Sequence, residues 1–159
     1  MWKAFAELQA LGWLTGKLPR MIAVQATGCA PIVKAYDEGE EHAPLWTDAH
    51  TVAAGIRVPI AVGDFLILRA VRESGGQAVA VEDEHIMDIR DYIAREDGVL
   101  LCPEGAATAA AYQLALQKGW VDKSETAVLF NCATGLKYPM PAVGKHLDKD
   151  HDIDFSQFT

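Results

Sequence analysis

The sequence predicts an α/β fold in which helices cover both faces of a parallel sheet, a three-layer architecture. Short apolar runs that favour strands alternate with longer segments of helical periodicity along the whole chain. These short runs are mostly apolar, as expected for strands that are buried on both faces of a parallel sheet. The chain contains no internal repeat and no low-complexity linker, so we expect a single domain over residues 1–159.

The composition restricts the class of protein. Half of the 159 residues are hydrophobic, which excludes a disordered chain. With 14 basic and 22 acidic residues the net charge is −8, which argues against nucleic acid or an anionic membrane as a partner. No apolar run approaches the ~20 residues of a membrane span. Three widely spaced cysteines form no disulfide framework, and no signal peptide is recognisable, so we expect a cytoplasmic protein.

Periodicity and chain-breaking residues define the expected elements. Helical segments carry apolar residues three or four positions apart, whereas strand segments are short and mostly apolar. In chain order we expect a helix at 2–11, a strand at 21–26, helices at 31–39 and 65–73, a strand at 78–81, helices at 82–98 and 106–116, and a strand at 127–130.

Periodicity and capping signals support the helices of the first half. Phe5 and Leu8 lie on one face of the first helix. Pro31 starts the second, because the missing N–H of proline costs nothing in a first turn. Asp64 is expected to cap the third helix and Gly75 to end it.

The second half carries similar signals. Ile86, Ile89 and Ile93 form an apolar stripe on the helix that Gly98 ends. Pro103 stands where the following alanine-rich helix could start. This composition allows other elements to approach that helix closely, so we expect it to be central.

Three segments of small residues are candidates for a ligand site. The predicted buried strand at 127–130 leads into Cys-Ala-Thr-Gly-Leu-Lys-Tyr-Pro at 132–139. Glu104 and Gly105 form a hinge between an apolar run and a helix, and Gly55 lies between apolar residues, which suggests a close backbone approach. In open α/β sheets, ligands bind beyond the carboxyl ends of the strands. For the segment around Gly55, an ordinary surface loop is the alternative.

A metal site is not expected. His42 and His50 are eight residues apart, with no third His or Cys at a suitable spacing, so we interpret them as histidines of the surface or of the surroundings of a site, and not as metal ligands. The acidic segment 145–154 lacks the glycine and terminal glutamate of an EF-hand loop. We expect residues 140–159 to form a solvated C-terminal arm that packs against the body.

The three candidate segments also carry a family resemblance. Residues 131–139 resemble the closing motif of threonine synthase, a fold type II pyridoxal phosphate enzyme, and residues 50–59 and 102–107 resemble it too. Nearly the whole chain is similar, but only to the C-terminal part of that enzyme. The resemblance implies pyridoxal 5′-phosphate as cofactor. It also implies an incomplete α/β domain, part of the large cofactor-binding domain.

The resemblance implies roles for particular residues. Cys132 stands where the family usually has a threonine or serine facing the pyridine nitrogen, and its thiol, a weak neutral donor, would leave that nitrogen largely unprotonated. A buried structural thiol is the alternative for Cys132. Glu104 would lie near the ring or the substrate, or would cap a helix. The cofactor-binding residues implied in this way are Gly55, Glu104, Cys132, Thr134 and Gly135.

The implied activity is the conversion of O-phosphohomoserine and water to L-threonine and phosphate. No lysine here lies in the context of the family's Schiff-base lysine, and the glycine-rich phosphate loop is absent, so we expect the chain alone to be inactive. A free sheet edge predicts self-association or pairing with the missing N-terminal half. The alternatives are a non-catalytic remnant or interaction module, or a segment of another fold type II lyase such as a serine/threonine dehydratase.

Overall fold

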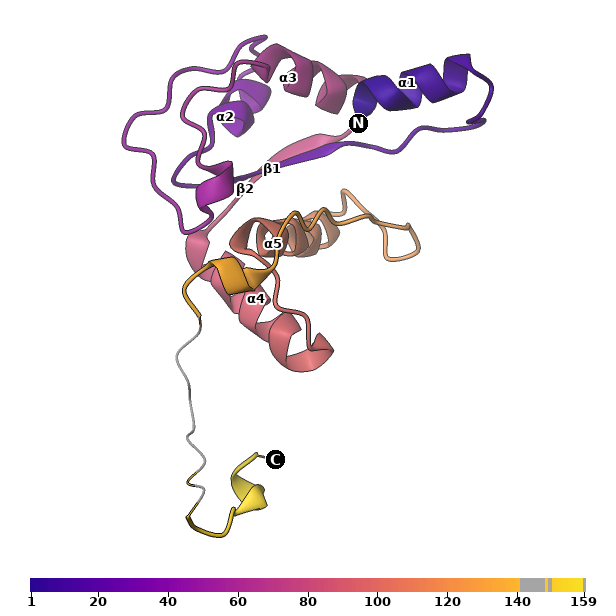
Figure 1. The fold of residues 1–159 in the computed structure, drawn as a ribbon. Coiled ribbons are helices and arrows are strands. Elements are labelled where there is room, and N and C mark those ends of the chain that lie inside the picture. Colours follow the sequence, from indigo (N-terminus) through magenta and orange to yellow (C-terminus); the bar gives the residue numbers. More distant parts are fainter. Residues whose placement is uncertain (141–147, 149, 159) are drawn as a thin grey trace.

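The computed structural model describes residues 1–140, 148 and 150–158, which form an α/β structure (Figure 1). Its elements agree in type and order with seven of the eight that the sequence predicts. In chain order they are α1 (Trp2–Ala10), β1 (Ile22–Ala26), α2 (Pro31–Asp37), η1 (Ala54–Ile56), α3 (Asp64–Glu73), β2 (Gln77–Val81), α4 (Asp83–Asp97), α5 (Pro103–Gln117), η2 (Gly135–Lys137) and η3 (Phe155–Phe158).

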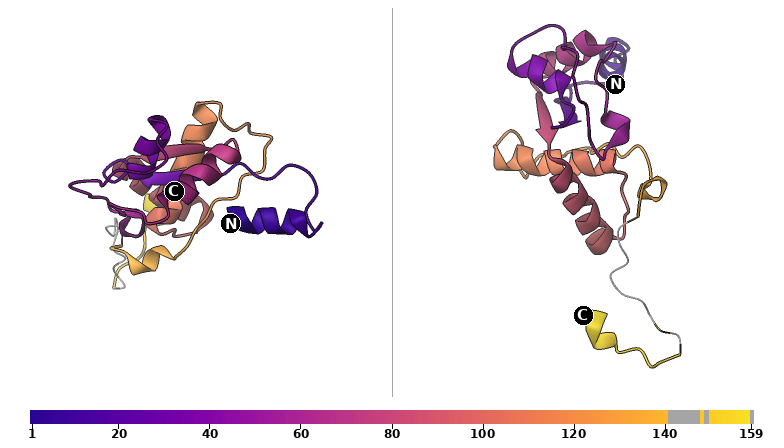
Figure 2. Two further views of the ribbon diagram at one scale, coloured as in Figure 1. Left: turned by 90° about the horizontal axis from the view of Figure 1, so that it is seen from above. Right: turned by 90° about the vertical axis from the view of Figure 1, so that its left-hand side faces the viewer.

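The described elements form three layers. β1 and β2 pair in parallel, with Val24 opposite Val79. Helices α2 and α3 cover one face of this two-stranded sheet, and α5 covers the other, with α4 packed against α5 (Figures 1 and 2). The predicted fold class is therefore confirmed, and the described residues supply two strands of the sheet.

The side chains of β1 alternate between the two faces. Val24 and Ala26 pack toward α5, whereas Ala23 packs in the small core beneath α2 and α3. Gln25 points to the same side as Ala23, and its Oε1 accepts hydrogen bonds from the N–H groups of Ile32 (2.9 Å) and Val33 (3.1 Å). A buried glutamine thus satisfies the first turn of α2, whose N-cap residue Ala30 has no side-chain acceptor.

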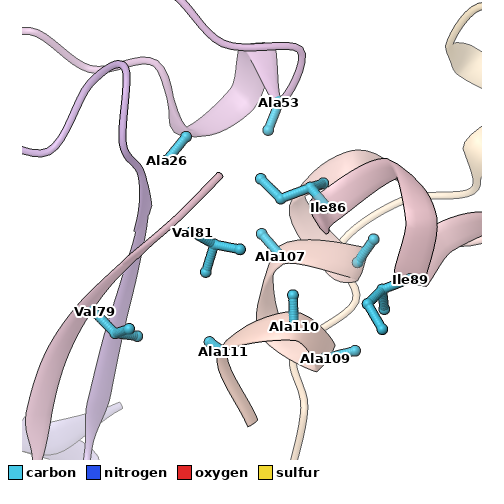
Figure 3. Packing of buried hydrophobic residues seen from close by; sticks show 11 residues of the cluster. Ala26, Ala53, Val79, Val81, Ile86, Ile89, Ala107, Ala109, Ala110 and Ala111 are labelled. Atoms are coloured by element: carbon cyan, nitrogen blue, oxygen red, sulfur yellow. The ribbon is translucent and has the colours of Figure 1, made fainter. Parts of the chain in front are cut away.

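The main core lies between the sheet and α5, and small side chains make it possible. The buried alanines of α5 bring its backbone close to β2 and α4, and the larger side chains of those elements fill the remaining space (Figure 3). The cluster in Figure 3 includes Val79 and Val81 of β2 and Ile86 and Ile89 of α4. The interpretation of α5 as a central, closely packed helix is confirmed.

The predicted strand at 127–130 is wrong. These residues form no strand and are exposed, Val128 to 85% and Phe130 to 60%. Their composition favours a strand, but a strand forms only where a neighbour accepts its hydrogen bonds. Among the described residues no backbone group bonds to this segment, and the sheet consists of β1 and β2 alone.

Two helices differ in detail from the prediction. α1 is present, but none of its residues is buried, and the Trp2 indole N–H donates to Glu73 of α3 across 2.9 Å. Asp64 is the first residue of α3, and Gly63 takes the N-cap position. The Asp64 carboxylate accepts hydrogen bonds from the N–H groups of Phe65 and Ala43 (both 2.7 Å), so it ties a loop to the helix.

The C-terminal arm is described in part. Residues 141–147, 149 and 159 lie outside the described residues, and so does part of the acidic segment 145–154. Asp148 and residues 150–156 are exposed. The predicted packing of the arm against the body is therefore not seen in its described residues.

Within the described part of the chain, no helix is long and apolar enough to cross a bilayer. His42 and His50 are both exposed, as predicted for surface histidines. The described residues of the chain contain no group of three or more His, Cys, Asp or Glu side chains that could hold a metal ion.

Candidate functional site

The candidate site is organised by Glu104, in the first turn of α5. That helix starts at Pro103, three residues before the predicted boundary, and Cys102 provides its N-cap, because the Cys102 Sγ accepts the Gly105 N–H across 3.3 Å. Glu104 is only 6% exposed. Since Cys102 caps the helix, the Glu104 carboxylate is available for more distant partners.

Two such partners bind one oxygen of Glu104. The Gly55 N–H and the Tyr138 hydroxyl both donate to Oε1, each across 2.6 Å. Gly55 lies in η1 and Tyr138 follows η2, so one carboxylate joins three segments that are far apart in the sequence. At Gly55 a Cβ would lie 2.8 Å from Oε1, which explains why glycine suits this position. The close backbone approach that the sequence suggests at Gly55 is therefore made to Glu104.

The electrostatics of this cluster favour an ionised Glu104. Burial by itself raises the pKa of the carboxyl, but the hydrogen bonds to the carboxylate, of which that from Tyr138 has the largest effect, together outweigh burial and hold the pKa below its ordinary value. The hydrogen bond from Tyr138 to Glu104, together with burial and the negative charge of Glu104, raises the pKa of Tyr138 to about 12. Near neutral pH, Glu104 is therefore a charged acceptor and Tyr138 a neutral donor.

The segment with the closing motif is fixed by backbone contacts to residues 100–102. The Gly135 N–H donates to the Leu100 carbonyl across 2.9 Å, and the Cys102 N–H donates to the Ala133 carbonyl across 3.3 Å. Thr134 caps η2, since its hydroxyl accepts the Leu136 N–H across 3.3 Å. The motif therefore lies beside the run that leads into Glu104.

The predicted site residues differ in their exposure. Glu104 and Gly135 are buried, whereas Gly55, Cys132 and Thr134 are exposed. Because Cys132 is exposed, the alternative that it is a buried structural thiol is wrong.

Sequence reasoning missed the contacts of three residues near Glu104, namely Tyr138, Cys102 and Asn131. Tyr138 lies inside the resembling motif, but nothing in the sequence pairs it with a carboxylate 34 positions away. Cys102 and Asn131 are joined by a hydrogen bond from the thiol to the Asn131 Oδ1 at 3.4 Å. Cys102 could have been found as an N-cap, because it directly precedes a proline that starts a helix.

The loop that carries Gly55 is held at two places. The Gly28 carbonyl accepts hydrogen bonds from the Trp46 indole (2.9 Å) and the His50 N–H (3.1 Å). The Asp83 carboxylate, at the start of α4, accepts the Thr51 hydroxyl (2.5 Å). These contacts place η1 beside the end of β1, where Gly55 meets Glu104.

The family of the chain follows from its sequence. A family model for pyridoxal-phosphate dependent enzymes matches residues 1–133, and the chain belongs to this family. Relatives include threonine synthase of Methanocaldococcus jannaschii, 33% identical over 143 residues, which are 90% of this chain and 35% of the relative. Threonine synthase of Mycobacterium tuberculosis is 34% identical over 142 residues, 89% of this chain and 37% of the relative. The resemblance to threonine synthase is thereby confirmed.

The chain spans about a third of the length of these curated relatives. The solved structure of maize serine racemase has a TM-score of 0.54 to this chain, at 19% identity, over 74% of this chain and 34% of that one. This similarity supports the fold type II architecture. The expected cofactor, pyridoxal 5′-phosphate, agrees with the family.

The residues of the site fit this cofactor in their chemistry. Cys132 and Thr134 expose neutral thiol and hydroxyl groups that can bond to a polar ring. The negative charge of Glu104 is partly compensated by two donors, both of which bind Oε1. Among the described residues, no lysine side chain forms a hydrogen bond or ion pair with Glu104, Gly55 or Tyr138.

The depressed pKa of Glu104 predicts a loss of stability in acid. A carboxyl group whose folded-state pKa lies below its ordinary value of 4.5 stabilises the fold above that value, and this contribution disappears as the pH falls through the folded-state pKa. We expect the midpoint of urea unfolding to decrease from about pH 5 to pH 3, and to decrease less in Glu104→Gln. Equal slopes in the two proteins would show that Glu104 does not contribute.

Proposed function

We propose that the chain forms the C-terminal part of a threonine synthase, which converts O-phosphohomoserine and water to L-threonine and phosphate. The observation that carries this proposal is the binding of Gly55 and Tyr138 to one oxygen of Glu104. These three residues come from the three segments that resemble the family's motifs. The identity to threonine synthases over about 90% of the chain supports the same conclusion.

When bound, the cofactor supplies an electron sink for the bond changes at the amino acid. In this proposal Cys132 faces the pyridine nitrogen, and its neutral thiol leaves that nitrogen largely unprotonated. Glu104 acts as a positioning residue, because its carboxylate holds Gly55 and Tyr138 in place. Thr134 and Gly135 hold the turn that presents Cys132.

The rest of the active site is proposed to come from the part of the family's domain that this chain does not match. No lysine here lies in the context of the family's cofactor-binding lysine, and no segment matches the glycine-rich phosphate loop. The chain by itself is therefore proposed to be inactive. Its small-molecule partner is a phosphorylated amino acid. A reducing cytoplasm is the proposed location, which suits three free cysteines.

A chimera tests the proposed function. This chain replaces the matching third of the threonine synthase of Methanocaldococcus jannaschii, and release of threonine and phosphate from O-phosphohomoserine is measured. We expect turnover of both products in equal amounts, and none from the isolated chain. A chimera that folds and loads cofactor, yet releases no threonine, would show that the proposal is wrong.

Substitutions of Cys132 in that chimera test its role. Cys132→Ser and Cys132→Thr are expected to keep turnover within about threefold, because a hydroxyl can bond to the same nitrogen. Cys132→Asp is expected to lower turnover at least about tenfold, because a carboxylate draws a proton onto the nitrogen and changes the ring's electron demand. The rates are compared per cofactor-loaded molecule. If the aspartate variant loads cofactor and turns over like the parent, the role assigned to Cys132 is wrong.

A further inference from the structure

Cys132 lies between two residues that are both tied to Cys102. On one side the Ala133 carbonyl accepts the Cys102 N–H across 3.3 Å. On the other side the Asn131 Oδ1 accepts the Cys102 thiol across 3.4 Å. The thiol of Cys132 itself is exposed. One backbone bond and one side-chain bond therefore fix the chain on both sides of the exposed thiol.

The bond from Asn131 is the contact that fixes the approach to Cys132. Among the described residues, the segment 127–132 makes no backbone–backbone hydrogen bond. Packing does not hold it either, because Val128 is 85% exposed and Phe130 60%. Without the amide of Asn131, the chain before Cys132 would be free to move relative to α5.

Cys102 is a firm anchor, because its own side chain is fixed at the start of α5. Its residue is fully buried, and its Sγ accepts the Gly105 N–H across 3.3 Å. Burial raises the pKa of the Cys102 thiol, so the thiol keeps its proton near neutral pH and can donate to Asn131. The η2 turn that follows Cys132 lies beside the same end of α5 in Figures 1 and 2.

Gly105 provides the space for this contact. A Cβ at Gly105 would overlap the Asn131 Oδ1 and would lie 2.9 Å from its Cγ. The Asn131 side chain is exposed, so it could swing outward, and the added methyl group would then break the bond to Cys102 without a large clash. The absence of a side chain at Gly105 is therefore what allows Asn131 to reach Cys102.

We propose that Asn131 is a positioning residue for Cys132, and that Cys102 and Gly105 act through it. This inference rests on the proposed function, in which the Cys132 thiol faces the pyridine nitrogen. Hydrogen bonds weaken steeply with distance and angle, so a shift of the chain at Asn131 would carry the neighbouring thiol out of reach of the ring. Asn131 acts on the cofactor only through Cys132.

Alkylation of Cys132 in the chimera described above tests the inference. Cys29 and Cys102 are buried, so in this chain iodoacetamide reacts first with Cys132, and mass spectrometry of the peptide identifies the site. The rate is measured with and without saturating pyridoxal 5′-phosphate. We expect the cofactor to slow the reaction at least about tenfold, because the thiol lies against the ring.

Two substitutions of Asn131 separate its acceptor from its bulk. Asn131→Ala removes the acceptor of the Cys102 thiol and is expected to reduce the protection by the cofactor to less than about threefold. Asn131→Asp keeps an oxygen at the same place and is expected to retain the protection of the parent. A loss of stability alone would not change this ratio of rates at saturating cofactor.

Gly105→Ala tests the contact from its other side. It is expected to reduce the protection as Asn131→Ala does, and the double variant is expected to lose no more than either single variant, because both break the same contact. Gly63→Ala is the matched control, since nothing lies within 4 Å of its new Cβ. It is expected to keep the full protection.

The possible results separate this inference from the proposed reaction. Equal protection in Asn131→Ala and the parent would overturn the inference, and so would a loss in Asn131→Asp as large as in Asn131→Ala. Additive effects of Asn131→Ala and Gly105→Ala would overturn it as well. An unprotected Cys132 in a chimera that makes threonine would contradict this inference but not the proposed reaction. A protected Cys132 that depends on Asn131, in a chimera that makes no threonine, would contradict the proposed reaction alone.

Discussion

Glu104→Ala is expected to lower the free energy of unfolding by about 3 kcal/mol, because it leaves two hydrogen-bond donors without their acceptor. The Gly55 N–H and the Tyr138 hydroxyl both bind the same buried oxygen, so their partners are lost together. Glu104→Gln keeps an oxygen at this position and is expected to cost about 1 kcal/mol. Urea unfolding monitored by circular dichroism measures both values.

The control for this experiment is Glu41→Ala. Glu41 is exposed, so its removal is expected to change stability by less than about 0.5 kcal/mol. If Glu104→Ala and Glu41→Ala have the same effect, Glu104 does not hold the three segments together. Loss of stability in Glu104→Gln as large as in Glu104→Ala would mean that the charge, and not the acceptor position, is what matters.

Gly135→Ala is expected to cost about 2–3 kcal/mol, because the added methyl group has no space. A Cβ at Gly135 would lie 2.5 Å from the Leu101 carbonyl oxygen and 2.6 Å from the Leu100 Cγ. A backbone carbonyl cannot rotate away as a long side chain can. The closing motif would therefore have to move away from residues 100–102, and the hydrogen bond from Gly135 to Leu100 would weaken.

Gly63→Ala is the matched control, because it makes the same change where nothing lies within 4 Å of the new Cβ. We expect it to change stability by less than about 0.5 kcal/mol. In the chimera, Gly135→Ala is further expected to lower cofactor loading, whereas Gly63→Ala is not. Equal stability and equal loading of the two variants would show that the motif does not need its close contact with residues 100–102.

Local sequence patterns were sufficient for most of the fold. The helix from Asp83 to Asp97 begins with two acidic residues in its first turn, and it ends at Gly98 with φ of 67°, a conformation that suits glycine. These signals act within one or two turns of the chain, so they can be read from neighbouring residues. The one element that failed, residues 127–130, needs a partner strand, and strand composition cannot provide it.

The candidate site could be predicted only in part. Gly55 and Glu104 were selected because their segments resemble the family's motifs, and the structure joins them by a hydrogen bond. Tyr138 was missed as the partner of Glu104, because nothing in either segment encodes the distance between them. The bond between Cys102 and Asn131 was missed for the same reason.

The sequence by itself determined the fold class, the order of the elements, the family and the segments that form the site. These properties follow from periodicity, from chain-breaking residues and from motifs, all of which are local. Only the tertiary structure decided that Gly55 and Tyr138 share one oxygen of Glu104, that Cys132 is exposed, and that residues 127–130 form no strand. The physical reason is that hydrogen bonds and burial depend on which distant segments meet, and a strand is completed only by its neighbour.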